Sequence, residues 1–138
     1  VQRHSGRLSV VAVRPEPAAY EVSWDLRRRA TLDLPAGAGR LELVRSARGP
    51  IAAAVLPARV TVRTRRGGER LRPRVGGPSR SLKSLLQNAA IGLGERRVLP
   101  LLCVGDQLLA AADLWVDARW QCAAPGAKRL RLIWHRPA

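Results

Sequence analysis

Positive charge is concentrated in residues 59–86, and the order of residues there limits the folds that can carry it. The stretch begins with alternation, because Val60, Val62 and Thr64 point to one side of an extended chain and the residues between them point to the other. A strand of this kind buries one face against a core and aligns guanidinium groups on the opposite face. The stretch holds a single acid, Glu69, and nine cations: Arg59, Arg63, Arg65, Arg66, Arg70, Arg72, Arg74, Arg80 and Lys83.

A turn and an amphipathic helix are expected after this strand. Gly67 and Gly68 permit a turn with positive φ or a close approach of the backbone to a ligand. Ser79 or Ser81 can cap the helix, and Gly92 is its expected end. The buried stripe of the helix would consist of Leu82, Leu85, Leu86 and Ala89. Because the first N–H groups of a helix are unpaired, we expect its start to attract anions among the arginines.

Two interpretations of this charge are a solvated surface and a binding site for a polyanion. Nine cations beside one acid repel one another, which destabilises the fold unless an anion lies among them. Arginine outnumbers lysine eight to one in the stretch, and guanidinium groups suit bidentate contacts with phosphate. The formal net charge of the 138 residues is +15. We therefore favour binding, with nucleic acid as the first expected partner and an anionic membrane surface as the second.

Four short blocks follow one another along the chain: GGERLRP at 67–73, SRSLKSLLQ at 79–87, LPLL at 99–102 and LWV at 114–116. At this spacing they resemble the C-terminal domain of bacterial tRNA(Ile)-lysidine synthetase, over roughly residues 59–134. Two positions depart from the family pattern. The chain reads IGLG at 91–94, where a Pro-Pro-Trp-like element is usual, and Cys103 stands where an aromatic residue is common.

The resemblance implies both a fold and a parent enzyme. The fold would be a layered β domain that is shared with part of the phenylalanyl-tRNA synthetase β subunit. The parent enzyme would use ATP, with Mg, to adenylate the wobble cytidine of an isoleucine tRNA with a CAU anticodon, and would then attach lysine. The family activates ATP with an N-terminal Ser-Gly-Gly-x-Asp-Ser loop, which is absent here. We therefore expect neither a cofactor nor catalysis in this chain alone.

The resemblance also implies a role for the basic stretch, because the C-terminal domain of the family grips the acceptor end of the tRNA. The expected contacts are with phosphates and sugars, since an A-form stem is read mainly through its shape and backbone. Glu69 would orient Arg66 or Arg70 through an ion pair, and Gly67 and Gly68 would allow close backbone approach. The expected RNA-binding residues are Arg63, Arg65, Arg66, Arg70, Arg72, Arg80 and Lys83.

The whole sequence predicts a mainly β, sandwich-like domain with one α-helix packed alongside. Hairpin turns are expected at 35–39 and at Gly105-Asp106, and Trp24 is expected to anchor the packing. We divide this single compact domain into a lead-in with N-terminal strands at 1–58 and a motif-bearing part at 59–138. Strands are expected at 7–13, 31–34, 40–44, 59–65, 98–104, 107–112, 114–116 and 129–134.

Composition excludes several classes of protein. No apolar run approaches the roughly 20 residues of a membrane span, and no signal peptide is apparent, so we expect a cytoplasmic protein. With no Phe, one Tyr and four Trp, the chain lacks the stacking platforms of a single-strand binder. Cys103 and Cys122 have no metal-site spacing and are expected to be reduced. Because the sequence contains no Met, we expect a domain excised from a longer protein.

Two alternatives to tRNA recognition stay open. The first is a generic RNA- or polyanion-binding module, which would bind any duplex with equal affinity. The second is a self-contained hydrolase or transferase that uses Glu69 with Asp113 or Asp117. His4 and His135 lie near opposite ends of the chain without the neighbours of a catalytic triad, and we expect them at the surface.

Overall fold

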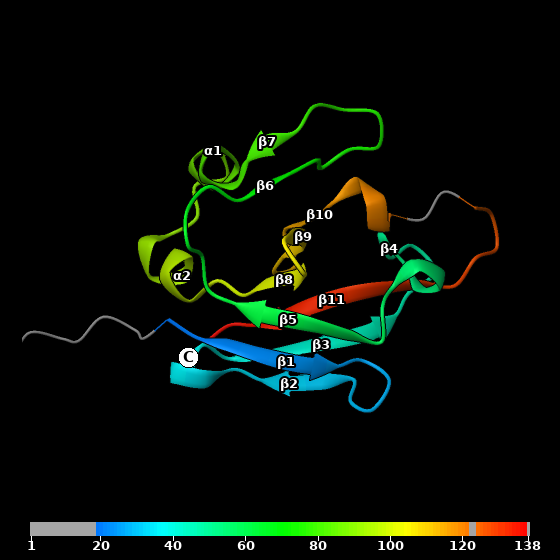
Figure 1. The fold of residues 1–138 in the computed structure, drawn as a ribbon, viewed down its shortest axis with the longest axis horizontal. Coiled ribbons are helices and arrows are strands. Elements are labelled where there is room, and N and C mark those ends of the chain that lie inside the picture. Colours follow the sequence, from blue (N-terminus) through cyan, green and yellow to red (C-terminus); the bar gives the residue numbers. More distant parts are fainter. Residues whose placement is uncertain (1–18, 122–123, 138) are drawn as a thin grey trace, which may run out of the picture.

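The computed structural model describes residues 19–121 and 124–137, which form three antiparallel sheets and two short α-helices (Figure 1). The expected strand at 7–13, His4 and Cys122 lie outside these residues. The helices are α1 (Leu82–Asn88) and α2 (Leu93–Val98). The strands are β1 (Glu21–Asp25), β2 (Thr31–Asp33), β3 (Arg40–Arg45), β4 (Ile51–Ala52), β5 (Arg59–Arg63), β6 (Arg70–Leu71), β7 (Arg80–Ser81), β8 (Leu101–Val104), β9 (Gln107–Ala111), β10 (Trp115–Val116) and β11 (Arg129–His135).

The two larger sheets contain most of the strands. One has the order β1-β5-β8-β9-β10, and the other has the order β2-β3-β11-β4. The third sheet is the β6-β7 hairpin. Three 3₁₀ turns lie at the ends of strands: η1 (Pro35–Gly37), η2 (Ala53–Val55) and η3 (Ala118–Trp120). This arrangement confirms the predicted mainly β, layered fold.

A largely aliphatic core joins the two larger sheets. In β5, Val60 and Val62 are 2% and 0% exposed whereas Arg59 is exposed, which confirms the predicted alternation. On the other sheet, Trp134 of β11 is buried and its indole N–H donates to the carbonyl of Ala38 at 2.9 Å. Trp24 of β1 is also buried, as predicted for a packing anchor. Leucine and tryptophan side chains therefore supply the bulk that phenylalanine provides in many cores.

The β6-β7 hairpin, α1 and the turn before them form a third layer beside the five-stranded sheet (Figure 1). We call residues 65–88 the basic cap, because they carry seven cations and one acid. The cap is attached to the core by Leu71 of β6 and by the predicted stripe of α1, although Ala89 of that stripe is exposed. The buried side chains of α1 are Leu82, Leu85 and Leu86.

The helical content differs from the prediction in one respect. Helix α1 ends at Asn88, and Ala90 then adopts a left-handed conformation with φ of 55°. Gly92, the expected end of α1, is instead the residue before α2, and Val98 belongs to α2 and not to a strand. Six residues are too few to show a helical period in the sequence, which explains why α2 was not predicted. Neither helix of the described part is long and apolar enough to span a membrane.

The predicted hairpins are confirmed by the strand pairing. Strand β2 pairs with β3, and β8 pairs with β9 across Gly105, which has φ of +58°. In the first hairpin, Gly37 and Gly39 both have positive φ, but they differ in surroundings. A Cβ atom on Gly39 would lie 2.1 Å from the carbonyl oxygen of His135, whereas one on Gly37 would meet nothing within 4 Å.

We predict that Gly39→Ala destabilises the chain several times more than Gly37→Ala. Both substitutions place a side chain at positive φ, which costs about 1 to 2 kcal/mol. Only the alanine at position 39 also forces the hairpin away from β11. Urea unfolding measures both free energies, and equal losses at the two positions would contradict this packing.

Candidate nucleic-acid interface

Glu69 holds the beginning of the basic cap in place. Its carboxylate accepts hydrogen bonds from Nη1 of Arg63 at 2.9 Å and from the backbone N–H groups of Arg66 and Gly67 at 2.8 and 3.0 Å. Its backbone carbonyl accepts from the N–H of Leu82, the first residue of α1, at 2.9 Å. The side chains of Glu69 and Arg63 are only 6% and 15% exposed. One acid therefore connects β5, the glycine turn and α1.

The protonation of this acid follows from its contacts. Burial alone would raise the pKa of Glu69, but hydrogen bonds from the Arg66 N–H and the Arg63 side chain outweigh it, and the net pKa is lowered. Burial would lower the pKa of Arg63, and the bond to Glu69 more than compensates, so that pKa is raised. The pair is therefore ionised at neutral pH.

These contacts correct two predicted roles. Arg63 was expected to contact RNA, but its guanidinium is largely covered and donates to Glu69 and to the carbonyl of Thr64. Glu69 was expected to orient the side chain of Arg66 or Arg70, and that prediction is wrong, because its side-chain partner is Arg63. The alternation along β5 correctly excludes Arg63 from the core. The chain after the strand then turns back over it, which a local pattern cannot show.

The predicted glycine turn is present. Gly67 and Gly68 have φ of +96° and +81°, and a Cβ atom at either position would meet nothing within 4 Å. The turn is therefore exposed, and its outer side is open to a large partner. Approach of RNA to this backbone stays a prediction.

The carboxylates of the chain pair with only some of the nine cations in residues 59–86. Arg59 lies 3.5 Å from Asp25, Arg63 pairs with Glu69, and the exposed side chain of Arg66 pairs with Glu21. Within residues 19–121 and 124–137, the other six have no carboxylate partner: Arg65, Arg70, Arg72, Arg74, Arg80 and Lys83. These six all belong to the basic cap.

The two arginines of the β6 segment point away from the core. Leu71 between them is 2% exposed, so Arg70 and Arg72 occupy the opposite side of the extended chain. Nε and Nη2 of Arg70 donate to the hydroxyl and carbonyl oxygens of Ser79 at 3.2 and 3.0 Å. Arg80 follows on β7 and is exposed. These neutral acceptors fix the Arg70 side chain without neutralising its charge.

A shallow pocket of about 260 Å³ separates these arginines from η3. Arg70, Arg72 and Arg119 line it together with Asp117. Asp117 is only 2% exposed, and its carboxylate accepts from the backbone N–H groups of Arg72 and Arg119, both at 3.0 Å. Asp117 also pairs with Nε of Arg119 at 3.3 Å, so the charges at this pocket without a carboxylate partner in the described residues are those of Arg70 and Arg72.

The beginning of α1 uses part of its donors within the protein, so we do not place an anion there. Ser81 is the cap, and its hydroxyl accepts from the N–H of Ser84 at 3.1 Å. The N–H of Leu82 donates to Glu69, so two of the first donors already have partners within the protein. The helix also has only seven residues. Lys83 remains exposed on α1, and its contribution is that of a single charge.

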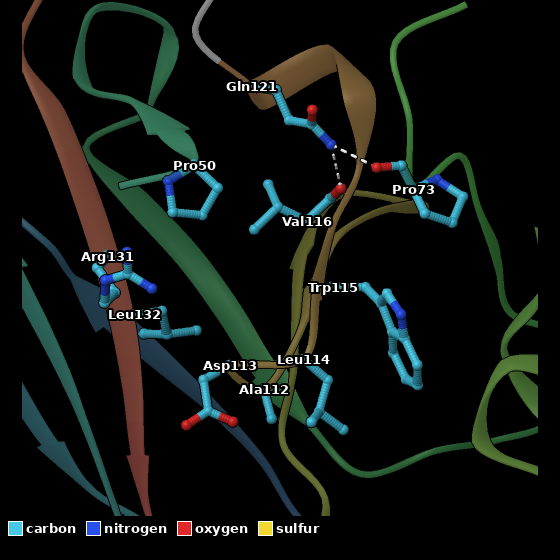
Figure 2. A pocket seen from close by; sticks show the side chains of 10 residues that line it. All are labelled: Pro50, Pro73, Ala112, Asp113, Leu114, Trp115, Val116, Gln121, Arg131 and Leu132. Atoms are coloured by element: carbon cyan, nitrogen blue, oxygen red, sulfur yellow. Dashed lines mark hydrogen bonds between the residues drawn. The ribbon is translucent and has the colours of Figure 1, made fainter. Parts of the chain in front are cut away.

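The carboxylates proposed for catalysis are engaged in separate places. Asp113 lines a pocket of about 290 Å³. Figure 2 shows it between β11, which contributes Arg131, and the segment that carries Val116. Asp113 accepts from the N–H of Trp134 and from Arg136, both at 3.1 Å. At one end of this pocket, the side-chain amide of Gln121 donates hydrogen bonds to the carbonyls of Val116 and Pro73 (Figure 2).

Asp117, Glu69 and Asp113 each have different partners, and none of these partners is a carboxylate. These contacts give no support to the hypothesis that the acids act in pairs. His135 is exposed and pairs with Glu42. Among the described residues, no three His, Cys, Asp or Glu side chains gather as a metal site.

Three further arginines were missed by sequence reasoning. Arg119 follows the core strands and joins the pocket beside β6, while Arg96 and Arg97 of α2 line a second basic pocket with Arg65. They lie outside the charge-rich stretch, so only tertiary structure brings them to it. The adjacent arginines Arg96 and Arg97 were the one feature of the sequence that could have indicated this second basic pocket.

A comparison with protein families gives a match over residues 60–134 to the family described as the TilS substrate C-terminal domain. Similar curated proteins are named tRNA(Ile)-lysidine synthase. The protein from Nitrosomonas europaea is 43% identical over 76 residues, which cover 55% of this chain and 16% of that protein. The Ralstonia nicotianae protein is 38% identical over 108 residues, which cover 78% of this chain and 22% of that protein. A Xylella fastidiosa protein is 37% identical over 134 residues, which cover 93% of this chain and 29% of that protein. The chain thus spans less than a third of these relatives.

A solved structure gives the same architecture. The crystal structure of a TilS C-terminal domain superposes with a TM-score of 0.56 at 22% sequence identity. The match covers 84% of this chain and 98% of the other. At this identity the likeness establishes the fold.

We predict that Glu69→Ala lowers the free energy of unfolding by about 3 kcal/mol, because Arg63 is left enclosed without its counter-charge. The matched control is Glu21→Ala, which removes the exposed pair with Arg66 and should cost less than about 1 kcal/mol. Urea unfolding at neutral pH gives both values. A loss at Glu69 no larger than that at Glu21 would show that the carboxylate does not hold the cap.

Proposed function

This chain belongs to the TilS substrate C-terminal domain family, and from that premise we propose that it binds tRNA through the basic cap. The partner is the acceptor stem of an isoleucine tRNA, and the contacts are chiefly with phosphates and sugars. The observation that carries the proposal is the group of six cations in the cap without carboxylate partners in the described part of the chain. Like charges held together in this way are stabilised by a polyanion.

The geometry of the cap supports recognition of helical RNA through its sugar-phosphate backbone. Arg70 of β6 and Arg80 of β7 lie on two paired short strands, and Arg72 directly follows β6, so the hairpin holds their separation. Guanidinium groups donate in a planar fork that matches phosphate oxygens. The described residues offer no row of exposed aromatic rings for stacking unpaired bases. Three of the four tryptophans, Trp24, Trp120 and Trp134, are buried, and Trp115 is partly buried. Of the predicted contacts, we retain Arg65, Arg66, Arg70, Arg72, Arg80 and Lys83, and we withdraw Arg63.

The reaction of the whole enzyme follows as a further part of the proposal. The similar proteins are named tRNA(Ile)-lysidine synthase, and the chain spans less than a third of those described above. We propose that the remaining part of such an enzyme binds ATP, with Mg, and lysine, and modifies the wobble cytidine of the CAU anticodon. This domain then holds the distant acceptor stem. Because its partner is tRNA, the protein acts in the cytoplasm.

The alternative is a generic polyanion-binding module, and RNA specificity separates the two. We predict that the 138-residue chain binds an isoleucine tRNA acceptor minihelix more tightly than unrelated RNA hairpins. The preference should persist at the higher of two salt concentrations, because screening weakens the non-specific part of binding first. Fluorescence titration measures the affinities. Equal affinity for all hairpins at both concentrations would favour the generic module.

We predict that Arg70→Ala and Arg80→Ala each weaken minihelix binding and each reduce the slope of log affinity against log salt by roughly one. The control is Arg28→Ala, which removes one exposed charge in the turn after β1. Its affinity should stay close to that of the unchanged chain. If all three variants behave alike, the cap has no special role in the contact.

A further inference from the structure

A second basic pocket lies between the glycine turn and α2. It has a volume of about 380 Å³, and its lining consists of Arg65, Gly67, Leu93, Arg96 and Arg97. Three of these five residues are arginines, and none of the described residues that line the pocket is acidic. The nearest acid in sequence, Glu95, pairs instead with Arg136 at 2.9 Å. The pocket therefore concentrates positive charge in a concave site.

Arg65 is incompletely satisfied in this pocket. Its Nε is enclosed by the protein and has no hydrogen-bond acceptor in the described part of the chain. Enclosed donors almost always have a partner, and a donor on a charged group is especially unfavourable without one. A small rotation of the Arg65 side chain toward the pocket would bring this donor to an anionic oxygen, an acceptor that the described protein atoms do not provide.

Arg96 is held in position without being neutralised. Its Nε donates to the carbonyl of Ile91 at 2.8 Å, and its Nη2 donates to the carbonyl of Leu86 at 3.4 Å. Both acceptors are neutral backbone groups near the end of α1. The charge is thus fixed in orientation before any ligand arrives, which reduces the cost of ordering the side chain on binding.

We propose that this pocket holds a single phosphate group of the bound RNA. The inference rests on the proposed function, and it extends the contact surface from the basic cap to α2. Arg65 belongs to the cap and also lines the pocket, so one RNA strand can reach both sites. Guanidinium groups on several sides suit the tetrahedral oxygens of phosphate. Leu93, which is 68% exposed, supplies an apolar contact for the adjoining sugar.

The phosphate can come from either of two sources, an internal phosphodiester or the 5′-terminal phosphate of the RNA. The test is a titration of two acceptor minihelices that differ only in a 5′-phosphate or a 5′-hydroxyl group. The proteins are the unchanged chain, Arg65→Gln, Arg97→Gln and the control Arg28→Gln. Thermal unfolding of each variant verifies that it is folded.

We predict that Arg65→Gln and Arg97→Gln weaken binding about tenfold each, as expected for the loss of a charge-assisted hydrogen bond. The control should not change affinity. Weakening with both minihelices identifies an internal phosphodiester, and weakening with only the phosphorylated one identifies the terminal group. Unchanged affinity for both minihelices in both variants would overturn the proposal.

An RNA-free measurement separates failure of the pocket from failure of the proposed function. Inorganic phosphate is titrated into the chain while the Nε–Hε NMR signal of Arg65 is followed. We expect this signal to shift in the unchanged chain and in Arg70→Ala, and to shift less in Arg97→Gln. If Arg70→Ala and Arg80→Ala bind RNA normally but this signal responds, the cap proposal fails and the pocket stands. A signal that never responds, together with undiminished RNA binding by the pocket variants, refutes the pocket.

Discussion

The ion pair between Arg63 and Glu69 is the interaction on which the arrangement of the basic cap depends. Its two side chains are 15% and 6% exposed, so the attraction acts in a medium that screens charge less than water does. The same carboxylate closes the turn by accepting from the N–H groups of Arg66 and Gly67, and the carbonyl of Glu69 receives the first N–H of α1. Strand, turn and helix are thus set relative to one another by one residue. The buried Leu71 and the bond from the Arg72 N–H to Asp117 hold the far side of the cap, and the ion pair holds the side next to β5.

The distribution of acids explains why the cap keeps its positive charge. Ten acidic residues accompany 25 lysines and arginines, and several of these acids are used inside the fold. Glu69 and Asp117 are enclosed and serve backbone N–H groups, while Asp113 and Glu95 share Arg136. The surface of the cap consequently keeps its positive charge. Under the proposed function, neutralising this charge and releasing counter-ions from the nucleic acid would favour binding.

The sequence predicted the features that depend on local periodicity. The alternation in β5, the leucine stripe of α1 and the β8-β9 hairpin are found where the pattern indicated, and the cap is Ser81, one of the two serines expected. Features set by distant contacts were not predictable. The enclosure of Arg63 depends on the path of the chain after its strand, and the meeting of Arg65 with Arg96 depends on the placement of a helix too short to show a period. The expectation that the start of α1 attracts anions depended on its first N–H groups being unpaired. The N–H of Leu82 instead donates to the carbonyl of Glu69, which lies 13 residues earlier in the chain and could not be placed from the local pattern.

The central claim is that RNA lies against the basic cap, and mapping the contact by NMR tests it most directly. The Nε–Hε signals of arginines in the labelled 138-residue chain are followed while the acceptor minihelix is added. We predict that the signals of Arg70, Arg72 and Arg80 shift at the lowest RNA ratios, while those of Arg28 in the turn after β1 and of Arg45 at the end of β3 do not. Shifts spread evenly over all arginines, or concentrated on the β1 and β3 side, would contradict it.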